Sequence, residues 1–177
     1  MQTSLIDLIA GYKISYPEEE NFIYQFQALL MHPSAFNRDH LPGHITGSTW
    51  VINPNRSMVL LHHHRKLNKW LQPGGHADGD KNVLRVALRE LEEETGIKKS
   101  KQLVNGIFDL DIHPIPARKD FPEHLHYDVR FCFEVEEYEP IIVSTESLDV
   151  KWMSFDELKS NTINASLFRM MEKSLKL

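Results

Sequence analysis

Cysteine is almost absent from this sequence. Cys132 is the only cysteine in 177 residues, so no internal disulfide can form and a reducing, cytoplasmic location is expected. Because it lies in the apolar run 129–135, we expect Cys132 to be a buried core residue rather than a nucleophile. The sequence also lacks a basic N-terminal segment followed by a long apolar stretch, and no window approaches the roughly 20 apolar residues of a membrane span. We therefore expect neither a secreted protein nor a membrane protein.

An excess of positive charge is missing as well. The 20 Lys and Arg residues are outnumbered by 25 Asp and Glu residues, which gives a formal net charge of -5. This balance argues against general nucleic-acid binding by a basic face. It allows a small phosphorylated ligand, since metal ions can supply positive charge locally. The remaining composition, 41% hydrophobic and 25% charged, is typical of a globular protein with one sizeable domain.

The spacing of apolar residues divides the chain into two parts. Residues 1–33 have helical spacing, with Pro17 between two helices and Pro33 closing the second. Further along, the pattern predicts short helices beginning near Phe155 and Asn164, and strands over 48–53, 57–61, 103–112, 127–135 and 150–153. The expected organisation is an N-terminal helical extension at 1–40 and one α/β domain at 41–177.

A strong helix is expected from about residue 81 to residue 95, directly after a glycine-bearing loop at 72–79. Asp80 is the expected N-cap of this helix and Gly96 its C-terminal stop. Its predicted packing face has apolar residues at i, i+3, i+4 and i+7, namely Leu84, Ala87, Leu88 and Leu91.

Three glutamates, Glu90, Glu93 and Glu94, crowd one side of the same helix. Their mutual repulsion, close to the negative end of the helix dipole, is unfavourable unless a hard cation such as Mg²⁺ binds them. Taken alone, three glutamates are more often a solvated acidic face. The neighbouring Gly74 and Gly75 favour a metal site, because a glycine backbone can approach a ligand closely and offer it a carbonyl.

The segment from Gly75 to Ile97 resembles the Nudix signature, G-x5-E-x7-R-E-U-x-E-E-x-G-U, in which U is an aliphatic residue. Residues 89–97, RELEEETGI, fill the second half of the signature completely, and the resemblance extends over about residues 44–160. It implies an α/β fold, namely a Nudix-type α/β/α sandwich with a mixed sheet. It also implies a hydrolase that cleaves a diphosphate linkage in a nucleoside diphosphate-type or related metabolite. Lys81 stands where the signature has its first glutamate, which leaves the number of bound metal ions open.

The resemblance also implies roles for individual residues. The expected ligands of Mg²⁺ or Mn²⁺ are the Gly75 carbonyl, Glu90, Glu93 and Glu94, and the expected catalytic residues are Arg89, Glu90 and Glu93. The general base is either Glu90 or a carboxylate on a later loop, where Glu146 is a loose match that is more often a surface glutamate. Substrate-binding residues stay unassigned, with four aromatic candidates: Trp70, Phe108, Phe121 and Tyr127.

Four further histidines resemble the metal site of isopentenyl diphosphate isomerase, which shares the Nudix fold. His44 precedes Trp50 by six residues, and His76 follows the glycine pair. His124 and His126 stand where that family has a Glu-x-Glu pair. The resemblance implies a second site for Zn²⁺ or another transition metal at His44, His76, His124 and His126, with ordinary polar roles as the alternative. Another histidine run, at 62–64, ends an apolar strand and is expected at the surface.

Three functions remain open. A hydrolase is favoured because the signature glutamates are all present. A prenyl-diphosphate isomerase-like enzyme is the second possibility. It is disfavoured because Gly74 stands where that family has its catalytic cysteine. A non-catalytic nucleotide-sugar-binding sensor is third, and a damaged signature would be its mark. The expected partner is a small-molecule diphosphate substrate, and the apolar N-terminal helices could support a homodimer.

Overall fold

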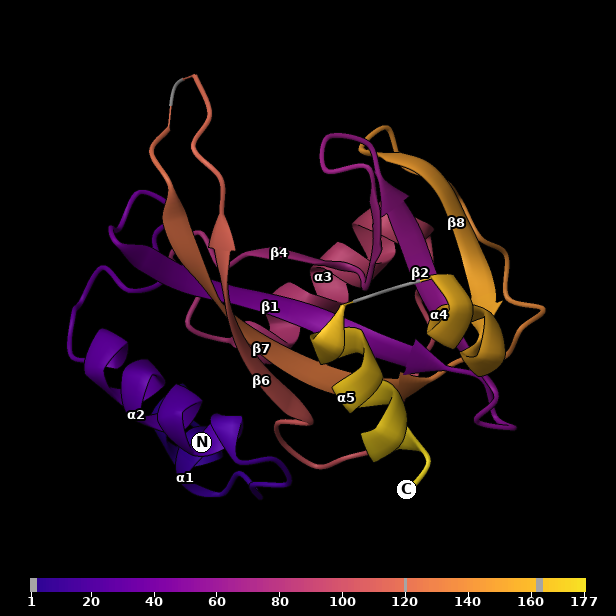
Figure 1. The fold of residues 1–177 in the computed structure, drawn as a ribbon, viewed down its shortest axis with the longest axis horizontal. Helices are drawn as coiled ribbons and strands as arrows, with labels where there is room; N and C mark the ends of the chain where they lie inside the picture. The colour runs from indigo at the N-terminus through magenta and orange to yellow at the C-terminus, as the bar shows by residue number, and fades with distance from the viewer. Residues whose placement is uncertain (1–2, 120, 162–163) are drawn as a thin grey trace.

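The computed structural model describes residues 3–119, 121–161 and 164–177. The helices are α1 (Leu5–Ala10), α2 (Glu18–Leu30), α3 (Val83–Thr95), α4 (Phe155–Asn161) and α5 (Ala165–Ser174). The strands are β1 (Gly43–Ile52), β2 (Met58–His64), β3 (Lys69–Leu71), β4 (Gly74–His76), β5 (Lys101–Gln102), β6 (Asp109–Ile115), β7 (His124–Glu134) and β8 (Ser147–Ser154). Figure 1 shows their arrangement.

Strand β1 is the axis of a mixed sheet. It pairs in parallel with β7 along its whole length, from Gly43 opposite Leu125 to Ile52 opposite Glu134. Its other edge is shared, because the antiparallel partner is β4 at its middle and β2 near its end. Strands β3 and β8 pair with β2, and β5 and β6 pair with β7. The middle of β1 is therefore flanked by β4 on one side and β7 on the other.

The two faces of the sheet carry separate hydrophobic clusters, because alternate residues of a strand point to opposite faces. On one face, Ile45 of β1 belongs to a cluster with Phe26 of α2 and Ala87 of α3. On the other, Trp50 of β1 belongs to a cluster with Met170 of α5. Helices thus cover both faces (Figure 1). The α/β/α sandwich with a mixed sheet and a helical N-terminal extension is confirmed.

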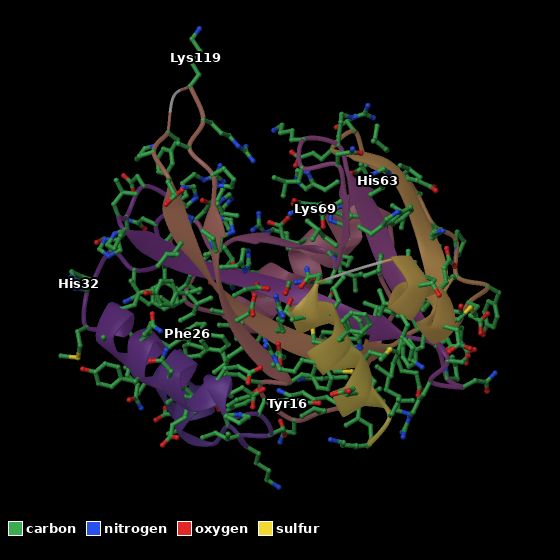
Figure 2. All side chains as sticks on the ribbon, viewed as in Figure 1. Tyr16, Phe26, His32, His63, Lys69 and Lys119 are labelled. Carbon is green, nitrogen blue, oxygen red and sulfur yellow. The ribbon has the colours of Figure 1, made fainter. Side chains whose placement is uncertain are left out.

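The N-terminal helices pack directly on the sheet. Phe26 is fully buried and its ring meets Tyr127 of β7 edge-on, with the centroids 5.3 Å apart. Figure 2 shows Phe26 between α2 and the sheet. Glu19, at the start of α2, is also fully buried and forms an ion pair with Lys173 of α5. Residues 1–40 therefore contribute both apolar and charged groups to the interior.

Several local expectations for the carboxylate helix were wrong. The glycine-bearing segment 72–79 contains strand β4, because Gly74, Gly75 and His76 pair with β1. The helix begins at Val83, and its N-cap is Asn82, whose side chain accepts a hydrogen bond from the Arg85 backbone N–H at 3.1 Å. Asp80 instead forms an ion pair with the Arg85 side chain. Gly96 ends the helix in the left-handed conformation, with a φ of 77°, as expected.

The expected strand over 103–112 was also misplaced. The structure has β5 at Lys101–Gln102 and β6 at Asp109–Ile115, and both pair with β7. Cys132 is fully buried, and burial raises the pKa of its thiol to about 12, so its expected role in the core is confirmed. None of the helices in the described parts of the chain combines the length and apolar character needed to span a membrane.

Candidate active site

Helix α3 turns two of the three signature glutamates, Glu90 and Glu94, inward. An α-helix advances by about 100° per residue, so Val83, Ala87, Glu90 and Glu94 share one face. Glu94 is 7% exposed, whereas the side chain of Glu93 is 58% exposed. The apolar residues buried with this face are Val83, Val86, Ala87 and Leu91. The buried side of α3 therefore carries carboxylates at its centre.

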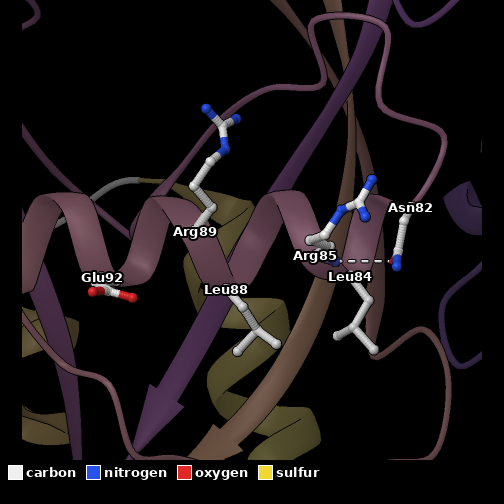
Figure 3. Close-up of a pocket in the computed structure, with 6 residues that line it drawn as sticks. All are labelled: Asn82, Leu84, Arg85, Leu88, Arg89 and Glu92. Atoms are coloured by element: carbon white, nitrogen blue, oxygen red, sulfur yellow. Dashed lines mark hydrogen bonds between the residues drawn. The ribbon is translucent and has the colours of Figure 1, made fainter.

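This orientation corrects the predicted packing face. Leu88 is 37% exposed, and Leu84 is only partly buried, because the buried stripe is centred on Ala87 and Glu90. The outward side of α3 forms a shallow depression, lined by Asn82, Leu84, Arg85, Leu88, Arg89 and Glu92 (Figure 3). Glu90 and Glu94 do not line it. Lys81 lies beyond the start of the helix, near Thr3, Leu5 and Leu8 of the N-terminal segment.

Strand β4 receives both inward-facing carboxylates. The Glu94 Oε2 atom accepts a hydrogen bond from the Gly74 backbone N–H at 2.9 Å. The Glu90 carboxylate lies against Gly75 so closely that a Cβ atom there would stand 2.5 Å from Glu90 Cδ and 2.6 Å from both its oxygens. Only glycine allows this approach of backbone to carboxylate. The structure thus brings Gly75, Glu90 and Glu94 together, with Glu93 on the same helix at the solvent edge.

Arg89 links α3 to the end of β4. Its Nη2 atom donates to the His76 carbonyl oxygen at 2.9 Å and lies 2.8 Å from Glu90 Oε1. Its Nη1 atom is 4.0 Å from Glu93 Oε1, which is a looser ion pair. Through these contacts Arg89 fixes the Glu90 carboxylate relative to the backbone of β4.

Ionisation of Glu90 and Glu94 is unfavourable unless a positive charge lies nearby, because both carboxylates are largely shielded from water. Burial raises the pKa of Glu90 to about 7, with Glu93 and Glu146 adding to the shift and Arg89 opposing it. Burial also raises the pKa of Glu94 to about 8, although the hydrogen bond from Gly74 lowers it. A divalent cation would remove this penalty by stabilising the ionised forms. Carboxylate and carbonyl oxygens are the donors that Mg²⁺ and Mn²⁺ prefer, so this set of residues fits such an ion.

Two other groups lie near the carboxylates. The negative charge of Glu146, which is exposed just before β8, raises the pKa of both Glu90 and Glu94. His62 was expected at the surface but is 1% exposed, with its Nδ1 atom 3.5 Å from Glu94 Oε1 and 2.9 Å from Ser147 Oγ. Period-two alternation from Leu60, which faces α3, would have found it.

The four predicted histidines also come together, on the other face of the sheet. His44 of β1 is paired with His126 of β7, and their ring centroids are 5.0 Å apart. The His124 ring is 5.0 Å from that of His44. The His76 ring, at the end of β4, is 5.2 Å from His44 and 5.0 Å from His126. Three strands therefore gather four imidazoles around one point.

The aromatic candidates for substrate binding separate into two groups. Phe108 and Tyr127 are 6% and 8% exposed and belong to the core, so neither is available for stacking on a ligand. Trp70 of β3 is partly exposed, stacks on His63 at 5.0 Å and has the Lys151 ammonium 4.9 Å from its ring centroid. Phe121 is partly exposed and meets the His124 ring edge-on at 4.9 Å.

Comparison with known proteins gives consistent results. A family model described as NUDIX domain matches residues 44–173. The asymmetrical bis(5'-nucleosyl)-tetraphosphatase of Rattus norvegicus is 32% identical over 108 residues, which are 60% of this chain and 70% of that protein. A Lactococcus lactis protein named "Probable DHNTP pyrophosphohydrolase" is 33% identical over 98 residues, 54% of this chain and 56% of that protein. A crystal structure of a C. elegans Ap4A hydrolase superposes with a TM-score of 0.57 at 17% identity, over 73% of this chain and 93% of that one, which shows a shared fold.

Proposed function

The chain belongs to the NUDIX domain family of hydrolases, and from this premise we propose that it is a metal-dependent enzyme that cleaves a diphosphate linkage in a nucleoside diphosphate-type or related metabolite. One observation carries the proposal. The side chains of Glu90 and Glu94 lie against β4 and are only 15% and 9% exposed, with Glu90 packed on Gly75 and Glu94 accepting a hydrogen bond from the Gly74 N–H. Carboxylates shielded from water in this way, with Arg89 as the cation that contacts Glu90, are suited to a hard cation.

The proposed roles follow from this geometry. The Gly75 carbonyl, Glu90, Glu93 and Glu94 would hold Mg²⁺ or Mn²⁺. A divalent ion there supplies charge neutralisation for the diphosphate and acidification of a water molecule. Arg89 positions Glu90 and the end of β4 through its contacts with both. Glu90 or the exposed Glu146 would accept the proton of the attacking water.

The substrate class is suggested by the relatives' names. A bis(5'-nucleosyl) tetraphosphate and DHNTP both contain a phosphoric anhydride chain next to a ring system, and they are the first substrates to test. Trp70 offers a partly exposed ring for stacking. It also has a cation beside it, Lys151, whose Nζ atom is 4.9 Å from the ring centroid.

The test is hydrolysis of these compounds by the purified chain with Mg²⁺ or Mn²⁺, followed by chromatography of the products. We expect turnover with metal and none after chelation. Glu93→Gln should lose most of the turnover, because Glu93 is exposed and its loss removes a ligand without disturbing packing. Glu92→Gln is the matched control on the same helix, since Glu92 pairs with Lys98 instead. Equal activity in the two variants would refute the proposed site.

Two alternatives have distinct signatures in the same assays. A prenyl-diphosphate isomerase-like enzyme would rearrange its substrate without releasing phosphate, but Gly74, at the position of the catalytic cysteine, has no side chain. A nucleotide-sugar-binding sensor would bind its ligand without turnover. We also propose a cytoplasmic location, on the single buried cysteine, and a homodimer whose existence light scattering would test.

A further inference from the structure

The histidine cluster is built from the sheet itself. His44 and His126 are register partners on the parallel strands β1 and β7, so their side chains share a face. His124 is two residues before His126 and projects to that face as well. The nitrogen atoms that His44, His124 and His126 could offer a metal all lie within 4.8 Å of one another. Strand pairing therefore holds three imidazoles at one place without any contribution from loops.

Two of these rings are anchored in a fixed tautomer. His44 Nδ1 lies 3.4 Å from the His40 carbonyl oxygen, and His124 Nδ1 lies 2.9 Å from the Pro122 carbonyl oxygen. A carbonyl can only accept a hydrogen bond, so each Nδ1 carries the hydrogen and each Nε2 keeps a free lone pair. An imidazole whose other nitrogen donates to a backbone carbonyl is the usual arrangement of a metal-binding histidine.

Two ring nitrogens of the cluster lie in the interior without a partner in the described residues. His44 is 1% exposed, and the Nε2 atoms of His44 and His126 are both buried without a hydrogen-bond partner in the described parts of the chain. An unpaired polar atom in the interior carries a desolvation cost that folded proteins rarely leave uncompensated. Two such atoms on neighbouring rings, whose centroids are 5.0 Å apart, indicate a ligand that contacts both nitrogens, and a cation bound by neutral imidazoles does so.

We propose that His44, His124 and His126 bind one transition-metal ion of the Zn²⁺ class, with His76 as a fourth ligand. Nitrogen donors select such an ion over Mg²⁺, which prefers oxygen. Zn–N bonds of about 2.0–2.1 Å place tetrahedral ligand atoms roughly 3.4 Å apart. The nitrogens of His44, His124 and His126 lie within 4.8 Å of one another, so small side-chain rotations suffice to reach this geometry. The His113 ring lies 5.6 Å from that of His126, and its Nδ1 atom contacts Asp111 Oδ2 at 3.0 Å, so His113 is a further histidine beside the proposed ligands.

The site would act on the backbone of β4. His76 ends this strand, and its carbonyl oxygen receives the hydrogen bond from Arg89. An ion on the His76 ring would join β4 to β1 and β7 through side chains, beside the Gly74 and Gly75 backbone that meets the carboxylates. The ion would therefore stabilise the position of β4 beside the proposed active site. Its binding does not depend on any hydrolytic activity.

The experiment uses the full chain without a histidine tag, stripped of metal by a chelator and titrated with Co²⁺ in excess Mg²⁺. We expect about one equivalent of Co²⁺ to bind with the intense visible absorption of a four-coordinate, nitrogen-bound ion, and Zn²⁺ to displace it. His124→Gln and His126→Gln should weaken binding at least about tenfold. His32→Gln, which changes an exposed histidine outside the cluster, should bind as the wild type does.

Two controls keep the result decisive. Glu93→Gln should retain the Co²⁺ spectrum, which separates this site from the carboxylates and from the outcome of the hydrolysis assay. Circular dichroism shows whether each histidine variant folds, and His76→Gln, at a partly exposed position, serves if the other two do not. The proposal is overturned if the wild type binds no Co²⁺, if the spectrum is the weak one of a six-coordinate ion, or if a folded histidine variant binds equally well.

Discussion

The Glu94 carboxylate accepts the Gly74 backbone N–H at 2.9 Å, and this bond joins the carboxylate helix directly to strand β4. The Arg89 guanidinium makes a second connection, to the carbonyl oxygen of His76 at the other end of the same strand. Since β4 spans only Gly74–His76, contacts at both of its ends leave its backbone little freedom relative to α3. The position of the Gly75 carbonyl is fixed by these two bonds, which makes each of them testable.

Replacement of Glu94 by glutamine should separate activity from stability. The amide oxygen of Glu94→Gln can still accept the Gly74 N–H, while the buried negative charge is removed. We expect hydrolysis to fall about 100-fold or more, because a ligand charge of the proposed metal site is lost. Thermal unfolding in the presence of a chelator should show equal or higher stability than the wild type, since repulsion among the glutamates is relieved. A large loss of metal-free stability would show that the ionised carboxylate has a structural role instead.

Gly75→Ala tests the close approach of Glu90 to the backbone. The new Cβ atom would lie 2.5–2.6 Å from atoms of the Glu90 carboxylate, which must move away. The end of a flexible side chain can move at low cost, so we expect a large loss of hydrolysis with a small change in melting temperature. Gly11→Ala is the control, because its Cβ atom would meet neighbouring atoms at 3.6 Å, an ordinary contact. Full activity of Gly75→Ala would exclude Glu90 from the site.

The sequence predicted the composition of the candidate site better than its orientation. A contiguous signature fixes which residues lie on α3, and helical spacing then brings Glu90 and Glu94 to one side. The direction of that side depends on packing against β4. Leu84 and Leu88 were wrongly placed on the buried face, because the true buried face includes carboxylates and therefore lacks a continuous apolar pattern. Period-two alternation from Leu60 predicts that His62 faces α3, so its burial was within reach of the sequence. Its partner Glu94 lies 32 positions further along the chain, and local periodicity does not show such a long-range pairing.

Acid should destabilise the protein through its buried aspartates. Burial alone would raise the pKa of Asp109 and Asp111, but Arg130 and Arg169 outweigh it and hold both values below the usual range. A depressed pKa in the folded state stabilises the protein above the unfolded pKa of about 3.9, and this stability is lost as the pH falls further. We expect the free energy of unfolding to decrease below about pH 4, by roughly 1.4 kcal/mol per pH unit for each aspartate.

Asp111→Asn isolates one of these groups. At neutral pH it should cost about 3–5 kcal/mol, since Arg130 and Arg169 lose a buried partner. Its unfolding free energy should then depend less on pH below pH 4 than that of the wild type, as measured by urea denaturation. Asp39→Asn, at an exposed position, is the control and should follow the wild type. An identical pH slope in Asp111→Asn and wild type would contradict the assignment.

The last prediction concerns residues 1–40, which we propose as an extension of the domain at 41–177. Phe26 is fully buried against Tyr127, so Phe26→Ala leaves a cavity between α2 and β7 and should cost about 3–5 kcal/mol. The Lys173 ammonium of α5 pairs with Glu19 of α2, which couples the extension to the far end of the chain as well. We therefore expect one cooperative unfolding transition, seen at the same denaturant concentration by circular dichroism and by tryptophan fluorescence, and shifted as a whole in Phe26→Ala. Tyr24→Ala, at a position 72% exposed on the same helix, should leave the midpoint unchanged. All three tryptophans lie beyond residue 40, so tryptophan fluorescence reports on the domain alone. Two separate transitions, with only the first sensitive to Phe26→Ala, would therefore mean that the extension folds independently.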